Sequence, residues 1–199
     1  MPYIDAFNHF FPKRFYEMLL ETPAGQKDMG KRVRGLPAIY DLANRGLLPP
    51  SFGLVGYGRR DWDDEQFADY VLQSVRERAR TPFRAEVWRQ LVEGIRFVTG
   101  AFDSDDGFAN LATTLADLDA VQGTEGNHAF YLSIPPDGFD QVIEQLRRQG
   151  LVDKQKRNPW SRVVIEKPFG HDLASARALE EKVSSVFSSD SVFRIDHYL

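Results

Sequence analysis

Arg162-Val-Val-Ile-Glu-Lys-Pro-Phe-Gly-His-Asp172 decides the fold, together with Val192-Phe-Arg-Ile195 one predicted helix later. Each stretch holds a short apolar run typical of a buried strand, and residues 173–187 between them have helical periodicity. Strand, helix and strand in this order predict a pair of parallel strands. Polar side chains follow both runs, at the carboxyl ends where open α/β sheets bind their ligands.

The same alternation extends back along the chain. Further strands are predicted at 52–58, 95–99 and 127–134, and further helices at 37–46, 64–80, 84–93, 107–121 and 139–149. We therefore expect an α/β fold with a Rossmann-like, doubly wound parallel sheet. No strand with a glycine-rich turn precedes the first of these helices, so the sheet is expected to be incomplete at its first strand. The Phe-rich stretch Tyr3–Phe11 is a candidate for a substitute strand.

Composition restricts the classes of function. The chain has 199 residues, a formal net charge of −4 and no cysteine. A negative net charge gives no general attraction to nucleic acid or to an anionic membrane. The lack of cysteine excludes disulfides and thiolate chemistry, and no apolar run reaches the roughly 20 residues of a membrane span. These features predict a cytoplasmic globular protein.

Four polar residues at the two strand ends are candidate ligand-binding groups. Lys167 can donate to a phosphate or a sugar hydroxyl, and His197 and Tyr198 can donate to phosphate oxygens. Asp196 can orient a partner histidine, as carboxylates do in acid–base pairs. The plainer alternative for Lys167 is a solvated lysine at the end of a strand.

Arg59 follows the predicted strand 52–58 and is a candidate cofactor-binding residue. In dinucleotide-binding sheets an arginine near this point accommodates the 2′-phosphate of NADP. A surface arginine pair with Arg60 is an equally good interpretation from position alone. Gly53, Gly56 and Gly58 lie within the strand and not between strand and helix, so they do not predict a phosphate cradle.

Several motifs together resemble glucose-6-phosphate dehydrogenase, in a form like that of actinobacteria. The resemblance covers about residues 36–199, which we expect to form an NADP-binding domain. Its motifs are Leu36-Pro-Ala-Ile-Tyr-Asp-Leu42, Leu54-Val-Gly-Tyr-Gly-Arg-Arg-Asp-Trp62, Asn127-His-Ala-Phe-Tyr-Leu-Ser-Ile-Pro-Pro136, Val164-Ile-Glu-Lys-Pro-Phe-Gly-His-Asp172 and Arg194-Ile-Asp-His-Tyr-Leu199.

The resemblance implies oxidation of glucose 6-phosphate to 6-phosphogluconolactone with NADP, the entry to the pentose phosphate pathway. It implies that Arg59 meets the 2′-phosphate and that Lys167 bridges substrate and cofactor. It further implies that His197 and Tyr198 hold the sugar phosphate, while Asp196 orients the catalytic histidine. That histidine and the dimerisation sheet belong to the family's second domain, which we expect to be absent here.

Residues 1–35 differ from the family pattern. Ile4-Asp-Ala-Phe-Asn-His-Phe-Phe-Pro12 resembles the start of a metal-dependent amidohydrolase of the aminocarboxymuconate-semialdehyde decarboxylase type. Those enzymes bind zinc through a His-x-His pair. Phe7 occupies the place of the first histidine and leaves His9 alone, so we expect no metal site. A fusion of two gene fragments near Gly35–Pro37 accounts for both resemblances.

Three functional interpretations therefore remain. The first is a glucose-6-phosphate dehydrogenase subunit or fragment that is inactive by itself, since effective general-base catalysis needs a positioned base. The second is a non-catalytic nucleotide-binding fragment. The third is a metal-dependent hydrolase fragment, supported only by residues 1–35.

Overall fold

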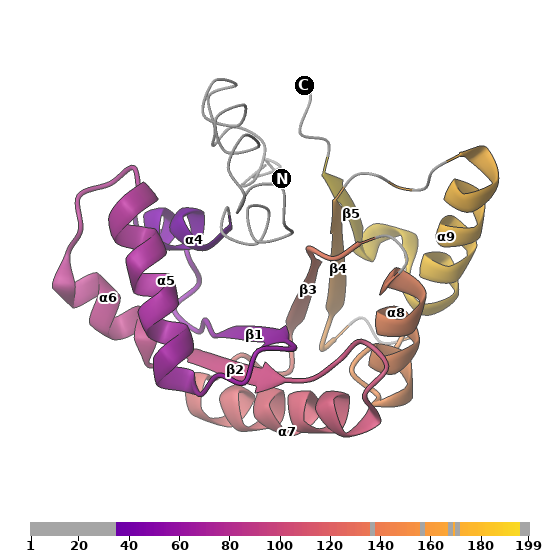
Figure 1. The fold of residues 1–199 in the computed structure, drawn as a ribbon, viewed down its shortest axis with the longest axis horizontal. Helices are drawn as coiled ribbons and strands as arrows, with labels where there is room; N and C mark the ends of the chain where they lie inside the picture. The colour runs from indigo at the N-terminus through magenta and orange to yellow at the C-terminus, as the bar shows by residue number, and fades with distance from the viewer. Residues whose placement is uncertain (1–34, 136–137, 156–157, 167–168, 170–171, 196–199) are drawn as a thin grey trace.

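Helices and strands alternate along the chain, as the sequence predicts (Figure 1). The computed structural model describes residues 35–135, 138–155, 158–166, 169 and 172–195. The elements are α4 (Gly35–Asn44), β1 (Leu54–Gly58), α5 (Asp64–Arg78), α6 (Ala85–Val92), β2 (Ile95–Thr99), α7 (Asp105–Gln122), β3 (His128–Leu132), α8 (Phe139–Arg148), β4 (Ser161–Glu166), α9 (Leu173–Val186), the 3₁₀ helix η2 (Ser189–Ser191) and β5 (Val192–Ile195). The predicted α/β class is confirmed, and the predicted element boundaries are correct to within two residues.

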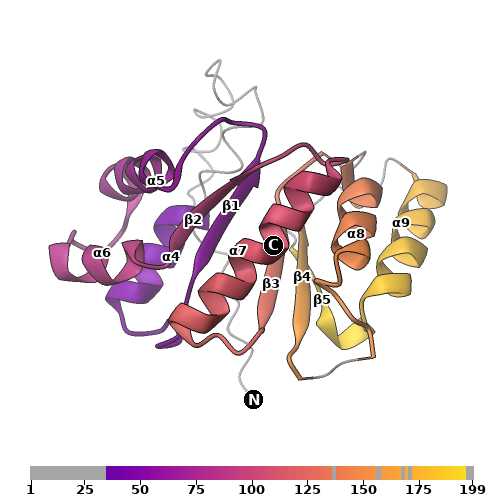
Figure 2. The same cartoon turned by 90° about the horizontal axis from the view of Figure 1, so that it is seen from below.

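The strands form two separate parallel sheets. One has the order β1-β2 and the other the order β3-β4-β5. Leu54 pairs with Ile95 in the first sheet, and Phe130 pairs with Val163 in the second. Figure 2 shows the two groups side by side, with β1 and β3 facing each other. Among the described strands, the pairing is thus interrupted between β1 and β3.

Helices cover both faces of β1 and β2, as in a doubly wound fold. Ile95 of β2 packs in a cluster with α4, α5 and α6, whereas Val98 packs in a second cluster with α7, α8 and α9. Side chains three apart on a strand point to opposite faces, so the two helix groups lie on opposite sides. Figure 1 shows this division of the helices.

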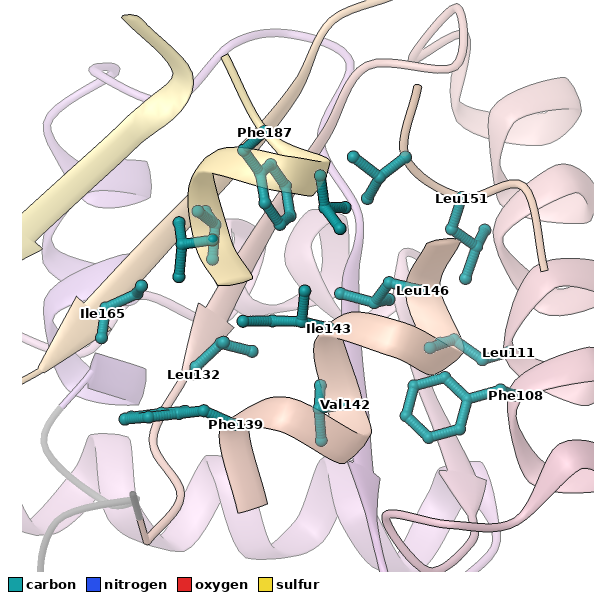
Figure 3. Close-up of a cluster of buried hydrophobic side chains, with 14 of the residues drawn as sticks. Phe108, Leu111, Leu132, Phe139, Val142, Ile143, Leu146, Leu151, Ile165 and Phe187 are labelled. Atoms are coloured by element: carbon teal, nitrogen blue, oxygen red, sulfur yellow. The ribbon is translucent and has the colours of Figure 1, made fainter. Parts of the chain in front are cut away.

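The buried residues of the larger hydrophobic cluster join β2, β3 and β4 to α7, α8 and α9 (Figure 3). At its centre Phe108, Ile143, Leu146 and Phe187 are each no more than 1% exposed. Val55 and Tyr57 of β1 are partly buried against the same cluster as Phe130 of β3. The two sheets therefore share one apolar layer although they do not pair.

Local sequence explains where the helices begin and end. Asp172 is the N-cap of α9, because its carboxylate accepts a 2.8 Å hydrogen bond from the Ser175 amide. Asp63 caps α5 in the same way through the Gln66 amide. Gly46 has a φ of +67° just beyond α4, a conformation that glycine adopts without steric cost.

Gly56 is required for packing. A β-carbon at this position would lie 2.6 Å from the ring of Phe67 and 2.8 Å from the ring of Phe97. The glycine lets both rings cover the centre of β1. This packing role agrees with the sequence-based rejection of Gly56 as part of a phosphate cradle.

Candidate functional site

The candidate site lies at the carboxyl ends of the strands. Glu166 ends β4 and pairs in register with Ile195, which ends β5. Both residues are 8% exposed. The two strands thus deliver the chain to adjacent positions just before Lys167 and Asp196. The side chains of Lys167, Asp196, His197 and Tyr198 lie outside the described residues, so their roles stay predictions.

Arg59 is exposed and follows the last residue of β1. Within residues 35–135 and the later described segments, its guanidinium makes no hydrogen bond or ion pair. Arg60 differs, because its guanidinium stacks over the Trp62 ring at 4.5 Å. The Arg60 carbonyl accepts a 2.7 Å hydrogen bond from the Thr99 hydroxyl, which fixes the loop against β2. The structure therefore separates the pair into a tethered Arg60 and an available Arg59.

A tyrosine–carboxylate contact crosses the edge between β3 and β4. The hydroxyl of Tyr131 donates a hydrogen bond to the carboxylate of Glu166. Neither residue is a candidate from the sequence alone, although a glutamate at the end of an apolar strand is a detectable signal. The contact attaches the buried side chain of Glu166, the residue directly before Lys167, to β3.

Ser133 follows β3 and supplies a further polar group. Its side-chain oxygen is buried and has no hydrogen-bond partner within the part of the chain that the structure describes. A buried hydroxyl without a partner is costly, and it suits a site that a polar ligand completes. It lies at the same strand-end edge as Glu166, because β3 and β4 are parallel neighbours.

Tyr57 fixes the loop after β2. Its hydroxyl donates a 2.7 Å hydrogen bond to the Ala101 carbonyl. The same hydroxyl would lie 2.6 Å from a β-carbon at Gly107, so glycine makes room for it at the start of α7. Burial, with a smaller contribution from the negative charge of Asp103, raises the pKa of Tyr57 to about 12.

The raised pKa of Tyr57 predicts a loss of stability at alkaline pH. The tyrosine pKa is about 10 in an unfolded chain, so the folded state holds this proton more tightly. The resulting contribution to stability is complete below about pH 10 and is lost as the pH rises toward 12. We expect the free energy of unfolding in urea to fall less between about pH 9 and pH 11 in Tyr57→Phe than in the wild type. An equal loss in both proteins contradicts the assignment.

His128 is the histidine that the described residues contain, and it lies at the opposite end of β3. Its Nε2 is 3.1 Å from the carboxylate of Asp119, to which the Thr124 hydroxyl also donates. This arrangement joins the start of β3 to the end of α7. His128 is therefore remote from the candidate site along the strand.

Neither a metal cluster nor a membrane helix is found in the described segments. They contain no group of three or more histidine, aspartate or glutamate side chains able to hold a metal ion. Their helices are also too short or too polar to cross a bilayer. His9 and the rest of the amidohydrolase-like segment lie outside the described residues, and the division of the chain near residue 35 stays a prediction.

A family model and individual known proteins that match this chain all point to one family. A family model described as glucose-6-phosphate dehydrogenase, NAD binding domain, matches residues 25–199. The chain is 61% identical over 168 residues to glucose-6-phosphate 1-dehydrogenase 2 of Mycobacterium tuberculosis, which covers 84% of this chain and 32% of the relative. It is 39% identical over 166 residues to glucose-6-phosphate 1-dehydrogenase of Chlamydia pneumoniae, covering 82% and 32%.

Solved structures give the same likeness. A glucose-6-phosphate dehydrogenase in complex with its substrate glucose-6-phosphate superimposes with a TM-score of 0.68 at 29% identity, over 90% of this chain and 35% of that one. Glucose-6-phosphate 1-dehydrogenase from Mycobacterium avium gives a TM-score of 0.68 at 27% identity, over 83% and 33%. The chain thus spans about a third of the length of the relatives it matches.

Proposed function

Because the chain belongs to the glucose-6-phosphate dehydrogenase family, we propose that it is the NADP-binding part of a glucose-6-phosphate 1-dehydrogenase. Such an enzyme oxidises the C1 hydroxyl of glucose 6-phosphate to the lactone. The placement of Arg59, exposed and unpaired within the described residues at the end of β1, supports this proposal most directly. We place the activity in the cytoplasm, the compartment that the cysteine-free sequence favours.

The described residues fit NADP at two points. Arg59 offers a fork of N–H donors that matches a phosphate, and a 2′-phosphate distinguishes NADP from NAD. Ser133 offers a buried hydroxyl at the same strand-end edge. When bound, NADP supplies the acceptor for the hydride that leaves the sugar. The fit is therefore to the phosphorylated cofactor.

The protein's own residues would hold the sugar phosphate. Lys167 would bind both substrate and cofactor, and His197 with Tyr198 would hold the phosphate. Asp196 would orient a general-base histidine in the rest of the enzyme. The Glu166–Ile195 register supports this grouping, since it brings the chain to neighbouring positions before both motifs. Glu166, held by Tyr131, directly precedes Lys167 in the chain and adds a polar group at the same strand end.

A non-catalytic nucleotide-binding fragment is the second candidate. It is favoured by the position of His128, whose partner Asp119 holds it at the amino end of β3. Both candidates require a surviving NADP site, so they share one binding experiment.

Replacing Arg59 with alanine should weaken NADP binding roughly 10- to 100-fold, because a charge-assisted hydrogen bond to phosphate contributes roughly 1.5–3 kcal/mol. Binding of NAD, which lacks the 2′-phosphate, should be unchanged. Calorimetric titration of both cofactors measures the two affinities. Arg177→Ala is the matched control, since Arg177 is an exposed arginine on the distant helix α9. Equal NADP affinity in wild type and Arg59→Ala contradicts the cofactor assignment.

A further inference from the structure

The backbone on both sides of Arg59 is hydrogen-bonded to the end of β2. The Gly58 carbonyl, directly before Arg59, accepts from the Gly100 amide at 2.9 Å. The Arg60 carbonyl, directly after it, accepts from the Thr99 hydroxyl at 2.7 Å. Two consecutive residues at the end of one strand therefore hold both neighbours of Arg59, and they fix the point at which its side chain leaves the main chain.

One of these two bonds depends on a side chain. The bond between Gly58 and Gly100 joins backbone atoms and continues the ladder between β1 and β2. The other bond requires the hydroxyl of Thr99, which pairs in register with Gly58. A residue without a side-chain donor at position 99 would leave the Arg60 carbonyl without this partner. Thr99 is exposed, so core packing does not account for the hydroxyl, and its visible role is in the loop.

The rest of the loop between β1 and α5 is also attached to β2. The Asp64 carboxylate, in the first turn of α5, accepts from the Phe97 amide at 2.7 Å and lies 3.5 Å from Nε of Arg96. The ring of Trp62 packs against that of Phe97, with the two centroids 5.5 Å apart. The loop is thus held at Trp62 and at its far end, as well as beside Arg59.

The two arginines of this loop differ in what holds their side chains. The Arg60 guanidinium stacks over the ring of Trp62, which itself contacts the rings of Phe67 and Tyr70. The Arg59 side chain is exposed and makes no hydrogen bond or ion pair within the described segments. Binding a ligand must offset the entropy of every group that it orders. A fixed backbone at Arg59 leaves only the side chain to be ordered.

We propose that Thr99 is a positioning residue for the cofactor: its hydroxyl holds the loop so that Arg59 is presented to the 2′-phosphate of NADP. The inference rests on the proposed function, because it takes Arg59 as the residue that binds this phosphate. Thr99 acts through the Arg60 carbonyl and not by contact with the cofactor. It therefore contributes to the preference for NADP over NAD, since NAD has no 2′-phosphate.

Replacing Thr99 with valine tests the inference, because valine keeps the branched shape and removes the hydroxyl. NADP binding should weaken about three- to tenfold, as expected for one lost hydrogen bond, and NAD binding should be unchanged. Thr99→Ser keeps the donor and should bind NADP within about twofold of the wild type. Calorimetric titration measures the affinities. Thr113→Val is the matched control, since exposed Thr113 also donates to a backbone carbonyl, that of Ala109 on α7.

A double-mutant cycle separates positioning from a direct contact with the cofactor. In the Arg59→Ala background, Thr99→Val should cause no further loss of NADP affinity, because the group that Thr99 positions is gone. An equal loss in both backgrounds overturns the inference, since Thr99 would then act independently of Arg59. Equal NADP affinity in Thr99→Val and the wild type overturns it as well.

The same titrations distinguish this inference from the proposed function. If Arg59→Ala binds NADP as tightly as the wild type, or if the wild type does not bind NADP, the cofactor assignment is wrong and the role of Thr99 falls with it. If Arg59→Ala weakens binding but Thr99→Val does not, the assignment stands and only the role of Thr99 is wrong.

Hydrogen exchange of the unliganded chain gives a reading that does not depend on the cofactor. The amides of residues 60–62 should exchange about three- to tenfold faster in Thr99→Val than in the wild type, because the loop has lost an anchor. The same amides should be unchanged in Thr99→Ser and in the control Thr113→Val. Unchanged exchange in Thr99→Val shows that the hydroxyl does not hold the loop and overturns the inference.

Discussion

Replacing Asp41 with alanine is expected to lower the free energy of unfolding by about 3 kcal/mol, since three donors lose a charged acceptor. Asp41 lies on α4 and is 4% exposed. Its carboxylate accepts from the Arg80 amide at 3.0 Å, the Thr81 amide at 2.9 Å and the Thr81 hydroxyl at 2.7 Å. These bonds attach the turn between α5 and α6 to α4. Urea unfolding followed by circular dichroism measures the loss.

Two further variants separate the acceptor role of Asp41 from a general effect of removing an aspartate. Asp117→Ala changes an exposed residue on α7 and should alter stability by less than about 0.5 kcal/mol. Asp41→Asn keeps the shape and one acceptor oxygen, so its loss should fall between those of the two alanine variants. If Asp41→Ala and Asp117→Ala have the same stability, the Asp41 bonds do not hold the turn.

The sequence predicts the elements of this fold well because each carries its own local signal. Ile95–Thr99 and Val192–Ile195 are short apolar runs, and both are strands with the predicted bounds. The role of Asp172 is also local, since an N-cap acts on amides two or three residues away. Alternation of such elements is sufficient to predict the α/β class.

Long-range contacts explain what the sequence does not predict. Tyr131 and Glu166 are 35 residues apart, and only the β3–β4 register brings them together. The stacking of Arg60 on Trp62, which distinguishes it from Arg59, depends on the path of one loop. The missing glycine-rich turn predicts an incomplete sheet, but the interruption between β1 and β3 among the described strands follows from the strand pairing. Pairing and side-chain direction are tertiary properties.

The purified 199-residue chain is expected to form NADPH from glucose 6-phosphate about 10⁴-fold more slowly than a full-length relative, or not at all. General-base catalysis contributes about 10²–10⁴-fold, and correct placement of the reacting groups contributes more. In the described segments, His128 is engaged with Asp119 at the amino end of β3, whereas the candidate site is at the carboxyl end. Growth of NADPH absorbance measures the rate.

The control for this assay must separate the chain from traces of a host enzyme. Turnover that co-purifies with the chain and falls in Arg59→Ala would contradict the expectation, whereas turnover unaffected by that variant belongs to a contaminant. The full-length relative from Mycobacterium tuberculosis, 61% identical over the shared region, is the positive control. A chain that binds NADP but does not turn over fits the non-catalytic nucleotide-binding candidate. Adding the remaining two-thirds of that relative as a separate polypeptide then tests whether the proposed site at the end of β4 can support activity.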